Sequence, residues 1–181
     1  MIRKNVKIMI YVALLIAGLA IWISFRAQEL SLYTLVRLTL VIVFAYVAMF
    51  FDISERRIPN GLVLGMFAAW ALMIFVMLIY SSNEGAQALI DSAIGLLVGG
   101  GVFMAVYFLS GKGLGGGDVK FMAAAGLYLG MAQTIPAILY GTVLAAIVGF
   151  TLVALGKMTK KDTIPLAPFL FIGIAITTFT A

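Results

Sequence analysis

Seven runs of apolar residues, separated by short polar gaps, fill almost all of this 181-residue chain. A helix needs about 20 consecutive apolar residues to cross the hydrocarbon core of a bilayer. The sequence therefore predicts an all-α polytopic membrane protein with about seven transmembrane helices. One run, 119–131, is short for a crossing, so we expect it to be tilted or to start in a cavity at the cytoplasmic edge. The runs are Ile8–Ser24, Leu32–Phe51, Gly61–Tyr80, Ala88–Leu109, Val119–Met131, Thr134–Leu155 and Ile164–Thr180.

The composition agrees with a membrane location. Hydrophobic residues make up 64% of the chain and charged residues only 10%, whereas charged residues average about 25% in soluble domains. Spans of this length leave little room for a separate soluble domain, which predicts one integral membrane domain over residues 1–181. The net charge of +5 does not indicate nucleic-acid binding, because the basic residues lie between the apolar runs and form no patch interleaved with aromatic residues.

The positions of Lys and Arg predict the orientation, because short cytoplasmic loops retain positive charge. With a cytoplasmic N-terminus, two basic residues, Arg26 and Arg37, fall outside and ten fall inside. We therefore expect a multi-pass membrane protein with its N-terminus in the cytoplasm. The first apolar run is longer than that of a typical signal peptide and has no clear cleavage site after it. We therefore predict that it is retained as a helix. The inner basic residues are Arg3, Lys4, Lys7, Arg56, Arg57, Lys112, Lys120, Lys157, Lys160 and Lys161.

The chain has no Cys and no His. Thiolate nucleophiles, Ser-His-Asp triads, disulfides and the common zinc sites are thereby excluded, and no cofactor or metal is expected. Any catalysis must use carboxylates, hydroxyls, Lys or backbone groups. Among the acids, Glu29, Glu84 and Asp91 lie in or beside outer loops and are interpreted as solvated surface charges. Asp162 is expected to pair with a lysine at 160 or 161.

Two other acids occupy unusual positions. Asp52 directly follows the second apolar run, and an acid at a helix C-terminus is unfavourable because that end carries partial negative charge. Asp118 follows a glycine-rich stretch, 111–117, and opens the fifth run. Each has an ordinary alternative: Asp52 as a loop-entry carboxylate among lipid headgroups, and Asp118 as a helix N-cap after a flexible loop. A phosphate-binding loop is disfavoured, because Asp and Val follow the last Gly in place of Lys and Ser or Thr.

The predicted topology brings these two acids to the same membrane face. Asp52 ends an outside-to-inside helix, and Asp118 begins an inside-to-outside helix. Two neighbouring carboxyl groups do not both ionise easily, so one retains a proton. The ionised group can act as a base on water while the protonated group donates to a peptide carbonyl. The residues alone thus make an aspartyl protease a reasonable hypothesis.

Two motifs carry a resemblance to a known family. The segment 51–60 reads Phe-Asp-Ile-Ser-Glu-Arg-Arg-Ile-Pro-Asn, and 115–120 reads Gly-Gly-Gly-Asp-Val-Lys. Together they resemble the signatures of the type IV prepilin peptidases, aspartyl proteases of the GxGD class. The segment 164–169, Ile-Pro-Leu-Ala-Pro-Phe, resembles the start of that family's last helix. The resemblance covers residues 32–180 as a six-helix core, preceded by an extra N-terminal helix at 8–24, and it implies Asp52 and Asp118 as the catalytic pair.

The resemblance also implies five supporting residues. Gly115 and Gly117 would shape the loop, Lys120 would stand beside the site, and Pro59 and Asn60 would fix the turn into the third helix. Pro59 and Asn60 can also be explained by helix formation, without any role in the site. Pro suits a helix start, where its missing N–H is not needed, and Asn is a favourable N-cap. For Lys120, the alternative is an ordinary positive-inside residue.

The implied activity is a membrane-embedded endopeptidase that removes a short basic leader from prepilin-like proteins at the cytoplasmic face. Its partners would be such proteins, each with a basic leader followed by a hydrophobic helix, and membrane lipid. Longer bifunctional relatives carry a cytoplasmic cysteine-containing region and also methylate the new N-terminus. This chain has no Cys, so the resemblance supports the peptidase activity and gives no ground for methyl transfer.

Pairs of Gly at four-residue spacing occur at 61 and 65, 95 and 99, and 126 and 130. Such pairs let helices approach closely in lipid. Packing within the bundle is the favoured role, with homodimer formation as the alternative.

Two other functions compete with the peptidase. A proton-coupled transporter would also use intramembrane carboxylates, but no ionisable residue is predicted deep in a helix to complete a path. A non-catalytic factor in pilus or secretion assembly would need only the Gly pairs. Replacing the two acids separates the three functions, because a peptidase would lose processing, a transporter would lose flux and a scaffold would lose little.

Overall fold

The computed structural model describes residues 2–110, 113–159 and 162–180, with side chains from residue 10 onward. These residues form helices and connecting loops, and contain no strand. The prediction of an all-helical chain is therefore confirmed. The helices are α1 (Ile2–Arg26), α2 (Leu32–Glu55), α3 (Asn60–Tyr80), α4 (Ser82–Leu109), α5 (Gly116–Ala154) and α6 (Ala167–Thr180).

Four of these helices, α2 to α5, are long and apolar enough to cross a membrane. The described residues thus contain six helices where the sequence predicted about seven. The difference arises in α5, which joins the expected runs 119–131 and 134–155 into one element of 39 residues. Gly130 lies inside it with φ 68° and ψ −174°, a conformation that is essentially restricted to Gly. The element therefore consists of two helical segments on either side of Gly130.

Close packing of α4 on α5 organises the centre of the bundle, and this is the most extensive helix contact in the described chain. A Cβ on Gly95 would overlap the carbonyl oxygen of Gly126, and one on Gly99 would overlap that of Met122. Gly95, Gly99 and Gly126 therefore act in helix packing, as predicted for the Gly pairs, whereas a Cβ on Gly130 would overlap the Asp91 carboxylate. By contrast, a Cβ on Gly61 or Gly65 of α3 would meet no atom within 4 Å in the described residues, apart from the adjacent residues and backbone of α3 itself.

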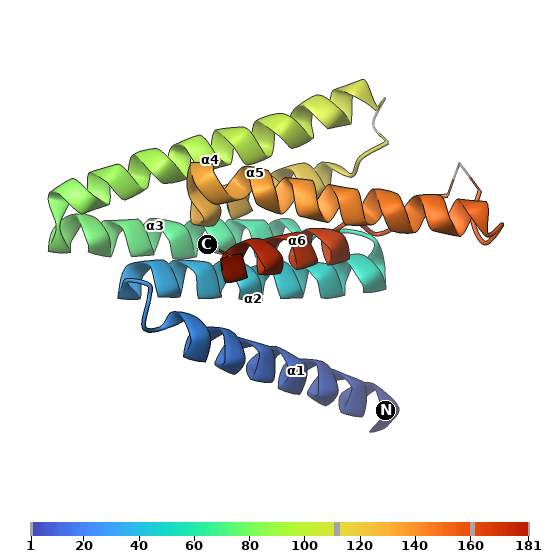
Figure 1. Cartoon of the computed structure of the whole chain (residues 1–181), viewed down its shortest axis with the longest axis horizontal. Helices are drawn as coiled ribbons and strands as arrows, with labels where there is room; N and C mark the ends of the chain where they lie inside the picture. The colour runs from blue at the N-terminus through green and yellow to red at the C-terminus, as the bar shows by residue number, and fades with distance from the viewer. Residues whose placement is uncertain (1, 111–112, 160–161, 181) are drawn as a thin grey trace.

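Helix α1 lies on one side of the bundle next to α2 (Figure 1). Its anchor is Trp22, which is 1% exposed and donates a hydrogen bond from Nε1 to the carbonyl oxygen of Thr178 at 3.3 Å. Nearer the other end of α1, the Tyr46 hydroxyl of α2 donates to the carbonyl oxygen of Tyr11 at 2.9 Å. These two contacts attach the extra N-terminal helix to α2 and α6.

The connections between α2 and α3, α4 and α5, and α5 and α6 gather at one end of the bundle (Figure 1). The α1–α2 and α3–α4 connections lie at the opposite end. This arrangement brings the two sequence motifs and the segment before α6 together.

Candidate active site

A cavity of about 360 Å³ opens among these connections. Four segments contribute to it: the end of α2, the loop before α5, the first turn of α5 and the segment before α6. Both Asp52 and Asp118 line it, so the structure brings together the two acids that the sequence singled out. The lining consists of Asp52, Arg56, Gly113, Leu114, Gly115, Asp118, Thr163, Ile164, Pro165 and Leu166.

Asp52 lies in the last turn of α2 and is only 7% exposed. Its Oδ2 accepts a hydrogen bond from the backbone N–H of Ala167, the first residue of α6, at 2.9 Å. The N-terminus of a helix carries partial positive charge and free N–H groups. The unfavourable position of this acid at the C-terminal end of α2 is therefore offset by the N-terminal end of α6. Helix α2 ends just beyond, at Arg56 in the left-handed conformation.

Asp118 lies in the first turn of α5 and is half-buried. Its backbone N–H donates to the carbonyl oxygen of Gly115 at 3.1 Å. A Cβ on Gly115 would lie 2.8 Å from Asp118 Oδ2, so any side chain at this position would press on the carboxylate. The glycine is needed here for space, because its φ of −70° is accessible to every residue.

The second glycine of the motif joins the two sequence signatures. A Cβ on Gly117 would lie 3.3 Å from Cβ of Ile58 and 3.4 Å from its backbone nitrogen. Ile58 is 7% exposed in the turn between α2 and α3. The start of α5 therefore rests on the turn that follows Asp52, which places the two acids across one cavity.

The remaining supporting residues meet beside this contact. Pro59 is the N-cap of α3, and no side chain caps that helix. The interpretation of Asn60 as a capping residue is wrong, because Asn60 is the first residue of α3 and its Oδ1 accepts from Lys120 Nζ at 3.2 Å. Lys120 and Asn60 are both exposed. Their contact links the two motifs a second time.

The electrostatics of the cavity follow from these positions. Both α5 and α6 begin at its wall, so two partially positive helix ends face two carboxyl groups. Two negative charges in one small cavity repel, which disfavours the ionisation of both carboxyl groups at once. Within residues 10–110, 113–159 and 162–180, no three Asp or Glu side chains are grouped as a metal site would require.

The other acids behave in different ways. Glu29 pairs with Arg26 at 2.7 Å and is exposed, as a surface charge would be. Asp162 accepts from the backbone N–H and the hydroxyl of Thr159 at 2.7 and 3.0 Å, and these donors hold the pKa of Asp162 below its usual range. The predicted pairing with a lysine at 160 or 161 lies outside the described residues.

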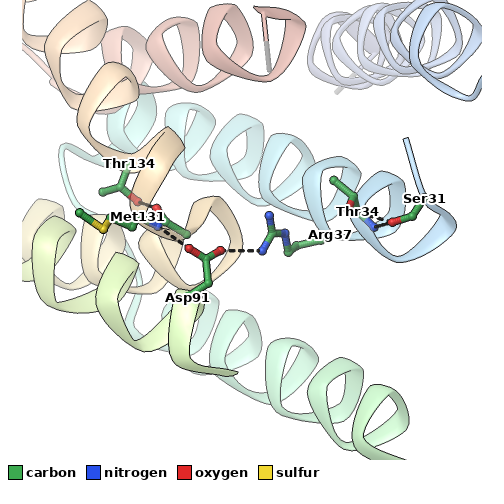
Figure 2. A network of polar contacts seen from close by, with 7 residues as sticks. Ser31, Thr34, Arg37, Asp91, Met131 and Thr134 are labelled. Atoms are coloured by element: carbon green, nitrogen blue, oxygen red, sulfur yellow. Dashed lines mark hydrogen bonds and ion pairs between the residues drawn. The ribbon is translucent and has the colours of Figure 1, made fainter. Parts of the chain in front are cut away.

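Asp91 is partly exposed, as expected for a surface charge, but it also takes part in a network that the sequence does not predict: its side chain is 41% exposed. This residue lies within α4, where its carboxylate pairs with Arg37 at 3.3 Å and accepts the backbone N–H of Met131 at 3.0 Å (Figure 2). The sequence gives little signal for this network, because Arg37 is 54 residues away and Met131 donates through its backbone. The only indication in the sequence is that Arg37 and Asp91, which carry opposite charges, lie within apolar runs.

The fold and site define a helical multi-pass membrane protein with two carboxyl groups facing one cavity. Comparison with known sequences gives the family: the sequence profile of the type IV leader peptidase family matches residues 38–150, and this chain belongs to that family. The resemblance drawn from the two motifs is thereby confirmed.

Curated relatives agree with this assignment. A prepilin leader peptidase/N-methyltransferase of Aeromonas hydrophila is 30% identical over 129 residues, which cover 68% of this chain and 42% of the relative. The protein of the same name from Bacillus subtilis (strain 168) is 28% identical over 123 residues, covering 67% of this chain and 46% of the relative. The chain thus matches less than half the length of these relatives. No solved structure matches it significantly.

Proposed function

We propose that this protein is an aspartic endopeptidase of the cytoplasmic (inner) membrane that cleaves the basic leader from prepilin-like proteins. The observation that carries the proposal is the placement of Asp52 and Asp118, from separate helices, on the wall of one cavity. The family supports a protease that processes prepilins. An aspartic mechanism is supported by the two carboxyl groups on the cavity wall and agrees with a chain that contains no Cys or His to serve as a nucleophile or base.

The two acids differ in environment, which suggests separate roles. The N–H of Ala167 at the start of α6 favours a charged acceptor at Asp52. In the proposal Asp52 is the base and Asp118 carries the shared proton. Asp52 takes a proton from water as the water oxygen attacks the scissile carbonyl carbon, and Asp118 protonates the carbonyl oxygen. When the C–N bond breaks, the proton on Asp52 passes to the leaving amine and Asp118 regains its own.

The proposed substrate follows from the family and from the position of the cavity. The cavity lies where the helix connections gather (Figure 1). Arg56 and Arg57 lie in the α2–α3 connection, Lys157 in the α5–α6 connection and Lys120 near the start of α5. Positive charge on short loops favours the cytoplasmic side. A substrate with a short basic leader in the cytoplasm and a hydrophobic helix in the bilayer would present its junction at this depth. The proposal does not include methyl transfer.

The test is co-expression with a prepilin, following leader removal by gel mobility. Asp52→Asn and Asp118→Asn retain side-chain size and remove the ionisable group, so cleavage should fall by orders of magnitude with each. The double variant should be scarcely worse, because residues that act as a unit are non-additive. Glu55→Gln is the matched control, since this nearby exposed acid pairs with Arg57 at 2.8 Å. Full processing by either Asn variant at equal protein level would refute the proposal.

A further inference from the structure

A polar network crosses the bundle away from the cavity and joins three helices (Figure 2). Arg37 of α2 pairs with Asp91 of α4, and Asp91 also accepts the backbone N–H of Met131 in α5. The Arg37 side chain is only 11% exposed. The Asp91 side chain is 41% exposed, but the charge of Arg37 in its buried position is costly to leave without a partner, so the ion pair favours keeping the three helices together.

The network depends on the break in α5. Gly130 has φ 68°, and a Cβ there would overlap the carboxylate of Asp91. The absence of a side chain lets Asp91 reach the N–H of Met131, the first residue of the second helical segment. In the same turn, the Thr134 hydroxyl donates to the carbonyl oxygen of Gly130. The polar backbone groups freed by a helix break in a membrane need partners of this kind.

The position of the network relative to the site is its most informative property. Fifteen residues of α2 separate Arg37 from Asp52, and thirteen residues of α5 separate Asp118 from Met131. At about 1.5 Å per residue, both distances are roughly 20 Å. The network therefore links the end of α2 that is distant from Asp52 to the junction of the two helical segments of α5.

Two points of attachment determine the angle between two rigid helices, whereas one does not. The first point is near the cavity, where Gly117 rests on Ile58. Ile58 lies in the turn after α2, and α2 and α5 also pack on each other and on α6. A change in the angle between α2 and α5 would alter the separation of the acids across the cavity. The second point is the network around Asp91.

We infer that Arg37 and Asp91 are positioning residues that, with the backbone of Met131, fix the angle between α2 and α5 at the junction of the two α5 segments. The separation of Asp52 from Asp118 is set in this way from about 20 Å away. The inference rests on the proposed catalytic role of the two acids. Neither Arg37 nor Asp91 touches the reacting atoms.

The test uses Asp91→Asn and Arg37→Gln in the full chain. Asp91→Asn keeps an oxygen for the Met131 N–H and removes the charge, while Arg37→Gln leaves the whole Asp91–Met131 contact in place. Arg37→Gln therefore remains informative if Asp91→Asn folds poorly. Glu84→Gln is the control, because Glu84 is an exposed acid in the first turn of the same helix as Asp91.

Two readouts separate positioning from a general loss of structure. The first is the distance, by pulsed electron spin resonance, between spin labels on Ile53→Cys and Gly116→Cys, which the absence of native Cys makes specific. The second is kcat and KM for prepilin cleavage by the unlabelled variants. We expect both variants to shift or broaden the label distance and to lower kcat about ten- to a hundredfold, since small misplacements have effects of this size. KM should stay within about twofold.

The double variant should resemble either single one, because both act through one link. An unchanged label distance with unchanged kcat in folded variants would overturn the inference, as would an effect on KM alone. If the Asp52→Asn protein still cleaved prepilin, the proposed function would fail, but the label distance would still report whether the network fixes the helix angle.

Discussion

Asp52 supplies the hydrogen-bond acceptor for the first residue of α6, through a contact of 2.9 Å between its Oδ2 and the N–H of Ala167. This residue therefore has a structural role beside its proposed catalytic one. The two roles can be separated by the choice of substitution, because Asn retains an acceptor oxygen and Ala does not.

Asp52→Ala should destabilise the protein by about 1–3 kcal/mol, since it leaves a buried N–H without a partner. Asp52→Asn should have a much smaller effect on stability while abolishing cleavage equally. Thermal unfolding in detergent, run beside the prepilin assay, measures both. Equal stability of the Ala and Asn variants would show that the contact with Ala167 contributes nothing to the fold.

Gly115→Ala tests the space around Asp118. The new methyl group would lie 2.8 Å from Asp118 Oδ2, so the carboxylate must move and cleavage should fall about tenfold or more. Gly116→Ala is the control, because no atom of the described residues lies within 4 Å of a Cβ at that position. Cleavage rates of the purified variants provide the comparison. Similar losses in both would indicate a requirement for loop flexibility, with no specific role for the space beside Asp118.

The Gly pairs on different helices should respond differently to Ala. Gly95→Ala would bring a methyl group into the backbone of Gly126 and should cost about 1–3 kcal/mol of stability through overpacking. Gly61→Ala and Gly65→Ala meet no neighbour within the described part of the chain, so their stability should change little. Detergent unfolding measures this, and crosslinking of the α3 variants tests the alternative of a homodimer. Loss of a wild-type crosslink in Gly65→Ala would support that alternative.

The orientation is tested by single cysteines added to a chain that has none. Ser54→Cys, Ser110→Cys and Thr159→Cys should react with an impermeant thiol reagent only from the cytoplasmic side, and Ser82→Cys only from the other. The expectation rests on the excess of Lys and Arg at one end of the bundle. Labelling of Ser82→Cys from the cytoplasmic side would show that the predicted orientation is inverted and that the cavity does not face the cytoplasm.

Activity should persist in metal chelators and after thiol alkylation, because the sequence contains no Cys or His from which a common zinc site or a thiolate could be built. Prepilin cleavage with and without each reagent gives the answer. Loss of cleavage in chelator, with recovery on adding zinc, would contradict the mechanism based on two carboxyl groups.

The sequence predicted those parts of the site that lie within short motifs. Asp52 and Asp118 were found because each adjoins an apolar run, and the positive-inside pattern placed both at one end. The partners that act across the chain were not predicted. Ala167 uses a backbone N–H located 115 residues from Asp52, and such a group leaves no trace in side-chain pattern. Asn60 was expected to cap α3, yet it bonds Lys120, because Pro59 already forms the helix start.

The break at Gly130 shows a second limit. The residues on both sides of Gly130 are hydrophobic. The sequence divides here into the runs 119–131 and 134–155, close to the observed break, but does not indicate that the two runs form one element. The conformation of Gly130 and the role of Asp91 depend on each other, and both depend on Arg37 in a distant helix. Local periodicity does not carry information of this kind.

The hydrogen bond between Asp52 and Ala167 joins two segments that lie 115 residues apart in the chain. The residues just before α6, Thr163, Ile164, Pro165 and Leu166, also line the cavity. A partly inserted chain that still lacks α6 would therefore carry both sequence motifs but only part of the cavity wall. The site is completed only when α6 docks against the end of α2, which couples the assembly of the bundle to the formation of the site.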